Sequence, residues 1–288
     1  MQNILVTGAS GFIGNALCRR LLAEGWKVRG TTRSASKKEV LPPEIEIVEI
    51  KSIDPSTEWE TALDGIDTVV ATPHQLGRFD GRNHAAHVRG AVSQLTKQLL
   101  EAGIPLTVLP GADVRVDERI PRLLQDDTVL TLADQGKHLL LELPQEAFID
   151  IERLLRQLAD RGFSVIISHP ERHPVLAARP EIIAKWSGLG ACVQITAGSL
   201  LGQFGPASQQ AAWYFLQSGV AGMVATDAHD TKHRCPSMKA AFKVLSQKLG
   251  QDTAGWLCIE NPKRVVDGKP IEPASRVVKQ SVKAENQK

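Results

Sequence analysis

From residue 82 onward, apolar and polar positions follow two alternating patterns. Short apolar runs predict strands, and stretches with apolar residues three or four apart predict amphipathic helices. The expected strands are 106–114, 138–144, 163–170, 191–199 and 223–229, and the expected helices are 82–103, 118–125, 150–162, 180–190, 206–219 and 236–250. Strand–helix alternation implies crossover connections, so we expect an α/β fold with a parallel sheet. The number of units suits a distorted seven-stranded barrel.

The first 70 residues carry a different pattern. The segment NILVTGASGFIG (3–14) is an apolar strand that runs into a turn with Gly8, Gly11 and Gly14 spaced three apart. Such a turn lets the backbone approach a pyrophosphate closely and packs the next helix against the strand. Further strands are expected over 27–33, 45–54 and 66–70. We therefore expect a partial Rossmann-like βαβαβ segment.

Side chains able to hold a metal ion stand at the ends of several predicted strands. They are His74, Asp113, Glu142, His169, Asp227 and His229. Parallel strands gather their C-terminal ends at one place, and imidazole with carboxylate binds Mn, Zn or Fe. One such residue alone is more often a cap or a turn residue. Six together favour a hydrolytic metal centre.

Five motifs containing these residues give the chain a resemblance to a known family. ATPH (71–74), LPGADVR (109–115), LLLELP (139–144), HPER (169–172) and TDAH (226–229) followed by an arginine stand in this order. Segment 71–270 thereby resembles the CpsB/CapC-type capsule-locus tyrosine phosphatases of the polymerase-and-histidinol-phosphatase (PHP) superfamily. The resemblance implies a PHP-type (β/α)7 barrel that uses Mn or a similar divalent ion to hydrolyse phosphotyrosine in proteins. It also implies a role in capsule or exopolysaccharide biosynthesis, with a bacterial tyrosine autokinase as the substrate.

The resemblance extends to the binding of phosphate. Arg172 and Arg234 match arginines that clamp phosphate, for which the guanidinium fork is suited. The alternative is that they are ordinary surface charges. Arg115 is a further candidate. His173 and His233, which flank the site, and His84 and His87 on the helix are expected to be surface residues.

One part of the family pattern is missing. That family opens with a strand carrying His-x-His, and no histidine precedes His74 in this chain. Asp113 also stands where many relatives have the longer glutamate. We therefore expect an incomplete barrel with one weakened metal position and reduced activity. A catalytically inactive fusion that binds phosphotyrosine or a kinase partner is the alternative.

Residues 1–70 resemble the start of an extended short-chain dehydrogenase/reductase of the sugar-nucleotide epimerase group. The resemblance assigns cofactor contacts to Gly8, Gly11, Gly14, Arg33 and Asp54, and the basic Arg33 suits NADP. Epimerase chemistry in that family needs Tyr-x-x-x-Lys, but the one tyrosine is Tyr214 and position 218 is serine. We expect no such catalysis and weak NADP binding; an NAD(P)-binding module is a further alternative. The expected domains are 1–70, 71–271 and a polar tail, 272–288.

Composition restricts the classes of function. The net charge is +2 and no basic stripe appears, so a nucleic-acid partner is not expected. No apolar run is long enough for a membrane span, and the start lacks a signal-peptide pattern. The 4 cysteines are scattered without a C-x-x-C, which favours a reducing, cytoplasmic location.

One cysteine has a spacing that deserves a separate interpretation. Cys258 and Arg264 have the C-x5-R spacing of cysteine-dependent phosphatases. That chemistry needs a loop of backbone N–H groups wrapped around phosphate and a thiolate of low pKa. The stretch CIENPKR has a proline, an acid and no glycine. We interpret the spacing as coincidence and expect NPKRVV to begin a helix.

Overall fold

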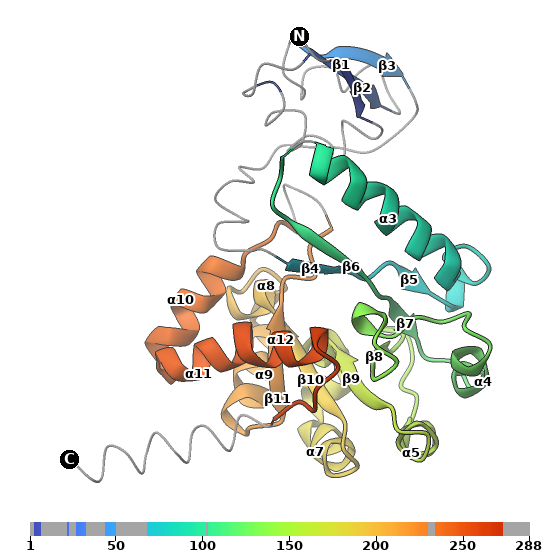
Figure 1. Ribbon diagram of the computed structural model, residues 1–288. Coiled ribbons are helices and arrows are strands. Elements are labelled where there is room, and N and C mark those ends of the chain that lie inside the picture. The colour runs from blue at the N-terminus through green and yellow to red at the C-terminus, as the bar shows by residue number, and fades with distance from the viewer. Residues whose placement is uncertain are drawn as a thin grey trace. The chain divides into compact units, whose positions relative to one another are not determined.

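The computed structural model describes residues 3–6, 22, 27–32, 44–49, 68–101, 103–229 and 234–272. By contacts between residues the chain divides into two units. The small unit comprises residues 1–66, 98–105 and 226–237, and the large unit comprises 67–97, 106–225 and 238–288. Each unit is described by itself (Figure 1).

The small unit contains a three-stranded parallel sheet. Its strands are β1 (Asn3–Val6), β2 (Lys27–Thr32) and β3 (Glu46–Glu49), in the order β1-β2-β3. The strand expected at the start of 3–14 and those expected over 27–33 and 45–54 are thus confirmed at their cores. The predicted cofactor residues lie outside the described part of the chain; they are Gly8, Gly11, Gly14, Arg33 and Asp54.

A six-stranded sheet forms the centre of the large unit. Its order is β11-β10-β9-β8-β7-β5, and every pairing is parallel. The strands are β5 (His74–Gln75), β7 (Asp113–Arg115), β8 (His138–Glu142), β9 (Ser164–Ser168), β10 (Cys192–Thr196) and β11 (Ala221–Ala225). β4 (Thr68–Ala71) pairs in parallel with β6 (Thr107–Pro110) just before β5 and β7 begin. The predicted parallel sheet is confirmed.

Helices connect these strands as the periodicity predicts. The longer ones are α3 (Ala85–Glu101), α4 (Ile120–Gln125), α5 (Glu152–Ala159), α7 (Pro180–Gly188), α9 (Gly205–Gln217) and α10 (Met238–Leu249). Shorter turns of helix are η2 (Gly77–Phe79), η3 (Leu132–Asp134), η4 (Pro170–Arg172), α6 (Pro174–Ala178), α8 (Ala197–Leu200), α11 (Gln251–Gly255), η5 (Trp256–Glu260) and α12 (Asn261–Val266). α12 confirms the helix expected at NPKRVV.

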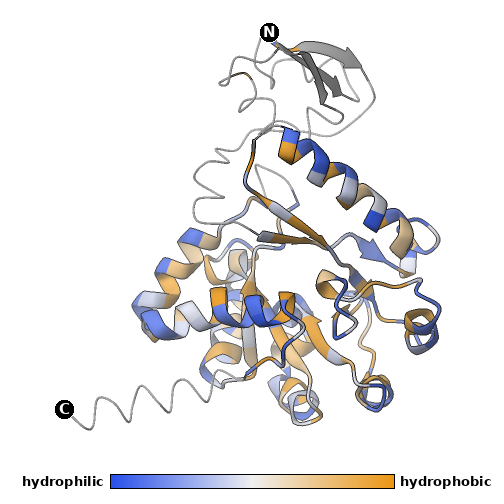
Figure 2. Cartoon of the chain, viewed as in Figure 1, coloured by the Kyte–Doolittle hydropathy of each residue, from blue (hydrophilic) through white to orange (hydrophobic). Residues whose placement is uncertain are grey.

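The core lies on the central strands of the large unit. All five residues of β8 are buried, and β9 buries Val165, Ile166 and Ile167. A parallel strand covered on both faces reads as a continuous apolar run, which explains the pattern of both segments. α5 turns Leu154, Leu155 and Leu158 inward and packs against β9. Figure 2 shows these strands as the apolar centre of the unit.

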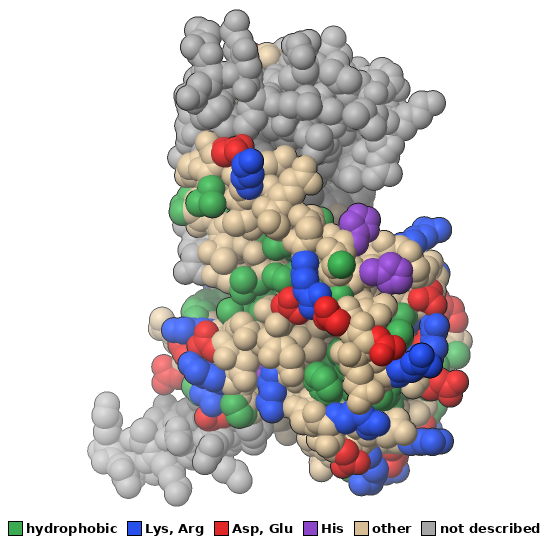
Figure 3. Space-filling model, turned by 45° about the vertical axis from the view of Figure 1, so that its right-hand side comes forward, with side chains coloured by type: hydrophobic (Ala, Val, Ile, Leu, Met, Phe, Trp, Pro, Cys, Tyr) green, Lys and Arg blue, Asp and Glu red, His purple; other side chains and the backbone are tan. Residues whose placement is uncertain are grey.

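The surface of the described residues carries charges of both signs. On the face shown in Figure 3, Lys and Arg side chains are interspersed with Asp and Glu rather than gathered into one patch. Among the described helices, none combines the length and the apolar character that crossing a bilayer would need.

Gly222 allows β11 to lie close to β10, which leads to a prediction on stability. A Cβ atom at Gly222 would overlap Sγ of Cys192. Gly222→Ala should therefore lower the free energy of unfolding by about 1–3 kcal/mol, the usual cost of overpacking. Urea denaturation should show a smaller loss when Cys192→Gly is also present. Gly188→Ala is the control, because nothing lies within 4 Å of its added methyl group. Equal effects of the two alanine substitutions would contradict the steric explanation.

Candidate metal centre

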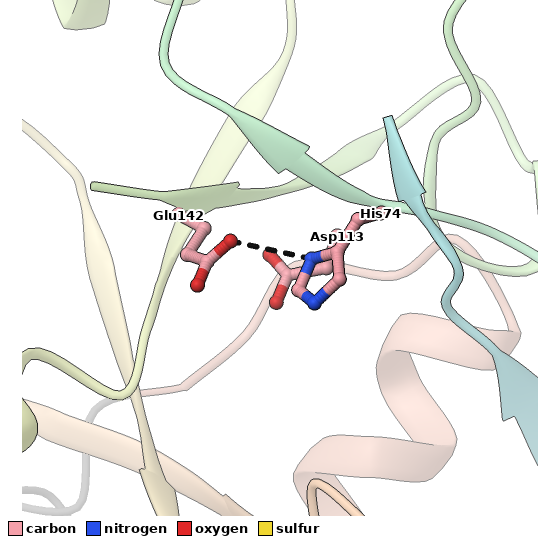
Figure 4. A group of neighbouring side chains, drawn as sticks. All are labelled: His74, Asp113 and Glu142. Carbon is pink, nitrogen blue, oxygen red and sulfur yellow. Dashed lines mark ion pairs between the residues drawn. The ribbon is translucent and has the colours of Figure 1, made fainter. Parts of the chain in front are cut away.

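Three of the predicted ligands lie together on one side of the sheet. His74, Asp113 and Glu142 come from the three neighbouring strands β5, β7 and β8 (Figure 4). One ligand atom of each lies within 4.8 Å of the others. A nitrogen and two carboxylate oxygens at this separation make a mixed donor set of the type that divalent transition metals bind.

The register of the strands brings these residues together. His74 is the partner of Asp113, and Arg115 is the partner of Glu142. Asp113 and Arg115 are two residues apart on β7, so their side chains point to the same face. The face therefore carries His74, Asp113, Arg115 and Glu142 side by side, although 68 positions of sequence separate the first from the last.

Glu142 lies at the centre of the group and is 6% exposed. Its Oε2 lies 3.2 Å from Nδ1 of His74 and 3.4 Å from Nε of Arg115, and its Oε1 lies 3.5 Å from Nε2 of His169. Burial opposes ionisation, but the interactions with His74, His169 and Arg115 prevail and lower the pKa of Glu142. The interaction with Glu142 also raises the pKa of His74, against the effect of burial. Glu142 is thus held as a carboxylate.

The side chain of Arg115 contacts Glu142 of this group and the residue that follows it. Its Nη1 donates to the carbonyl of Leu143 at 3.2 Å, in addition to the ion pair between its Nε and Glu142. These contacts indicate that Arg115 holds the carboxylate of Glu142, at the end of β8, in place.

Ser168 is a member of the site that sequence reasoning missed. Its Oγ donates to Oδ2 of Asp113 at 3.1 Å, and both residues are buried. Hydrogen bonds of this kind orient the ligands of a metal. Serine is a poor metal ligand, so the one signal in the sequence was its place directly before HPER.

His169 follows β9 directly and brings a second imidazole to Glu142. Its backbone is left-handed, with φ 35° and ψ 51°, and its N–H donates to the carbonyl of Gln194 at 3.0 Å. A residue other than glycine in this region is strained, and such strain is often found at functional sites. His169 is 6% exposed, so the turn places a buried imidazole beside the carboxylate of Glu142.

The other two predicted ligands lie in the small unit. Asp227 follows β11 by two residues and is left-handed, with φ 49°. Oδ2 of Asp227 forms an ion pair with Nη2 of Arg234, and Oδ1 lies 3.6 Å from Nδ1 of His229. The N–H of His229 donates to the carbonyl of Arg234 at 2.9 Å. Asp227 and His229 of the TDAH motif thus contact each other and Arg234, and the role of Asp227 and His229 as ligands stays a prediction.

The expectation that His173 is a surface residue is wrong. His173 is 4% exposed, and its Nδ1 accepts hydrogen bonds from the N–H groups of Val175 and Leu176 at 3.2 and 3.4 Å. It therefore caps the N-terminus of α6, a position that the sequence did not reveal because the helix has only five residues. His84 and His87 are exposed as expected, and His233 lies outside the described residues.

Cys258 is not a phosphatase nucleophile in this fold. It lies in the helical turn η5, and Arg264 lies in α12, so the stretch forms consecutive helical turns instead of a phosphate-binding loop. Burial raises the pKa of the Cys258 thiol to about 12. Nε of Arg264 donates to the carbonyl of Pro270 at 2.7 Å. The interpretation of the C-x5-R spacing as coincidence is confirmed.

Tyr214 is likewise remote from chemistry of the epimerase type. It is 51% exposed on α9, and the residue four positions later, Ser218, caps that helix. The expected amphipathic helix is confirmed, with Ala211, Ala212, Phe215 and Leu216 buried on its other face.

Comparison with known proteins gives two matches along the chain. The model of the family described as "Capsular polysaccharide synthesis, CpsB/CapC" matches residues 58–267. The model of the NAD dependent epimerase/dehydratase family matches residues 4–110. A ketoreductase of Aspergillus novofumigatus, nvfG, is 32% identical over 101 residues, which are 33% of this chain and 29% of that protein. The matched ranges overlap over residues 58–110.

The relatives of the longer segment are bacterial phosphatases. Tyrosine-protein phosphatase YwqE of Bacillus subtilis is 32% identical over 208 residues, which are 72% of this chain and 81% of that protein. Tyrosine-protein phosphatase CpsB of Streptococcus pneumoniae is 23% identical over 215 residues, which are 72% of this chain and 87% of that protein. A crystal structure from work on YwqE and CpsB, "unique metal-dependent tyrosine phosphatases", superposes with a TM-score of 0.70 at 32% identity. The superposed region covers 74% of this chain and 86% of the chain in that crystal structure.

Proposed function

The chain belongs to the CpsB/CapC family of capsular polysaccharide synthesis, and on that premise we propose that it is a metal-dependent phosphatase acting on phosphotyrosine in proteins. The observation that carries the proposal is the group of half-buried His74 with buried Asp113 and Glu142, and with His169 against Glu142. Its donors suit Mn or a similar divalent ion. When bound, such an ion supplies Lewis acidity toward a phosphoryl oxygen and a nucleophilic water at neutral pH.

The residues of the chain have separate tasks in this proposal. His74, Asp113, Glu142 and His169 would hold the ion, and the resemblance to the family assigns Asp227 and His229 as its further ligands. Arg172 and Arg234 bind the phosphate oxygens through their guanidinium forks, which match the geometry of phosphate. Ser168 and Arg115 keep the two carboxylates oriented. The phenolate of the substrate is the leaving group.

We further propose that the sheet of the large unit is an incomplete (β/α)7 barrel. Among its described strands, β5 and β11 stand at the two edges. The missing His-x-His strand of the family would supply one metal position, so this chain retains about two of three and a reduced activity. The proposed domains remain 1–70, 71–271 and the tail 272–288. Counting bound Mn per chain by elemental analysis tests the number of metal positions.

For the front segment we propose a Rossmann-like remnant of an epimerase-type fold. The strand order β1-β2-β3 supports it, because the first half of a dinucleotide-binding sheet has its first three strands in this arrangement. NADP would bind weakly through Gly8, Gly11 and Gly14, with Arg33 and Asp54. Calorimetry with NADP decides this point, and a micromolar dissociation constant would show that the glycine turn is a working cofactor site.

The proposed substrate is a phosphorylated tyrosine autokinase in the cytoplasm of a capsule-forming bacterium. The family membership and the two phosphatase relatives support this choice. Genes for such a kinase and for glycosyltransferases beside this one would support it further. An isolated phosphorylated kinase tail is the substrate to assay.

A chelator and a thiol reagent should have opposite effects on the activity. EDTA should abolish the hydrolysis of p-nitrophenyl phosphate and of a phosphotyrosine peptide, and added Mn²⁺ should restore it. In a chain carrying Cys18→Ser and Cys235→Ser, iodoacetamide should leave the activity unchanged, because burial raises the pKa of the remaining Cys192 and Cys258 thiols to about 12 and keeps them protonated at neutral pH. Activity that survives EDTA but not iodoacetamide would refute the proposal. Metal and phosphotyrosine binding without turnover would support the inactive fusion instead.

A further inference from the structure

The turn that carries His169 and Arg172 is tied to one distant segment, residues 194–204. The N–H of His169 donates to the carbonyl of Gln194 at 3.0 Å, as described above. Glu171 and Arg172 each make a further contact with the same segment. Three of four consecutive residues in the HPER motif are therefore anchored to the end of the next strand, β10, and to the residues that follow it.

Glu171 provides the anchor with the deepest burial. Its side chain is 0% exposed, and its Oε1 accepts hydrogen bonds from the N–H of Thr196 at 2.9 Å and from Oγ of Ser199 at 2.7 Å. A buried carboxyl group whose Oε1 accepts two hydrogen bonds fixes the turn to the segment. The backbone of the next residue, Arg172, is fixed with it.

The guanidinium of Arg172 lies on an aromatic ring. Its Cζ is 4.2 Å from the centroid of the Phe204 ring. A cation over the face of an aromatic ring is attracted by the electrons of the ring. The contact with Phe204 therefore restricts the positions that the guanidinium of Arg172 can take.

Gly198 makes room for this arrangement. A Cβ atom at that position would lie 2.9 Å from Cε2 of Phe204 and 2.5 Å from Oε1 of Gln203. The segment therefore folds back on itself so that the ring reaches Arg172, and any larger residue at position 198 would displace the ring.

We infer that Phe204 is a positioning residue, which holds the guanidinium of Arg172 in the orientation that binds the phosphate of the substrate. The inference rests on the proposed role of Arg172 as a phosphate clamp. Arginine has several rotatable bonds, and a side chain ordered before binding loses less entropy when the phosphate arrives. Phe204 therefore acts on binding of the phosphate rather than on the chemical step.

The test replaces the ring with a side chain of similar bulk. In the full chain with Mn²⁺, Phe204→Leu should raise KM for p-nitrophenyl phosphate and the calorimetric Kd for inorganic phosphate by about threefold to tenfold, with kcat nearly unchanged. Phe204→Tyr keeps an aromatic face and should restore both values. Phe215→Leu is the matched control, because Phe215 is 0% exposed on the neighbouring helix α9. It should lower the melting temperature without changing KM or Kd.

A double-mutant cycle separates this inference from the proposed function. Once Arg172→Ala has removed the guanidinium, Phe204→Leu should have no further effect on Kd. If Arg172→Ala weakens phosphate binding and Phe204→Leu does not, the positioning role is refuted while the clamp stands. If Arg172→Ala changes nothing, the clamp and the inference both fail. Should the chain prove inactive, the Kd for phosphate still decides the role of Phe204.

Discussion

Glu142→Gln should lower kcat/KM for metal-dependent hydrolysis of a phosphate ester by about 100-fold or more, and bound Mn with it. Loss of a group that merely orients a metal ligand costs about 10–100-fold in affinity or activity, so loss of a central ligand should cost at least as much. Glutamine has the same size but no charge. It would leave His74 and His169 without the carboxylate that each lies against, at 3.2 and 3.5 Å.

The measurement combines steady-state kinetics with elemental analysis of the purified protein. Glu146→Gln is the matched control, because this substitution makes the same chemical change at an exposed position four residues further along the chain. It should retain full activity and full metal content. A Glu142→Gln protein with unchanged Mn content and activity would show that the group of His74, Asp113 and Glu142 is a set of ion pairs and no metal centre.

Asn261→Ala should destabilise the large unit by about 2–4 kcal/mol. Asn261 is 0% exposed, and its Nδ2 donates to the carbonyls of Gly222 and Glu272 at 2.6 and 2.8 Å. Its Oδ1 accepts from the N–H of Glu272 at 3.2 Å. Removing the amide leaves buried polar groups without these partners, and each such group costs about 1–3 kcal/mol.

Urea denaturation monitored by circular dichroism measures this loss. Gln251→Ala, which removes an exposed amide at the start of α11, should change the free energy of unfolding by no more than about 0.5 kcal/mol. A similar small change for Asn261→Ala would contradict the structural role. Asn261 belongs to the CIENPKR stretch. Its hydrogen bonds join β11 to the residues after α12, so this asparagine has a structural role in that stretch.

The strand and helix alternation was predictable, whereas the shortest elements were not. α6, α8 and α11 have four or five residues each, too few for a helical period to show. The single strand expected over 106–114 is divided into β6 and β7 at Gly111. A Cβ atom there would lie 2.8 Å from Cγ1 of Val70 and 3.3 Å from the carbonyl oxygen of Ala71. That close approach of β4 depends on a partner 40 residues away, which local sequence does not contain.

The candidate site was predictable as far as its residues have distinctive chemistry. His74, Asp113, Glu142 and His169 could be selected because imidazole and carboxylate at strand ends are unusual. Their grouping depends on strand register, which became known with the structure. Ser168 and Phe204 could not be selected, since serine and phenylalanine are common in ordinary packing. The ligand roles of Asp227 and His229 and the glycine turn at the start of the chain stay predictions.

The shape of β5 bears on the association of the protein with itself. An edge strand offers unpaired N–H and C=O groups that can recruit a strand from another molecule and begin aggregation. β5 is two residues long, Pro73 before it has no N–H to donate, and Leu76 after it turns away with φ 66°. β5 therefore offers too few free backbone groups for a strand of another molecule to pair with it. Among the described strands, the one that supplies His74 thus forms an edge of the sheet that resists polymerisation.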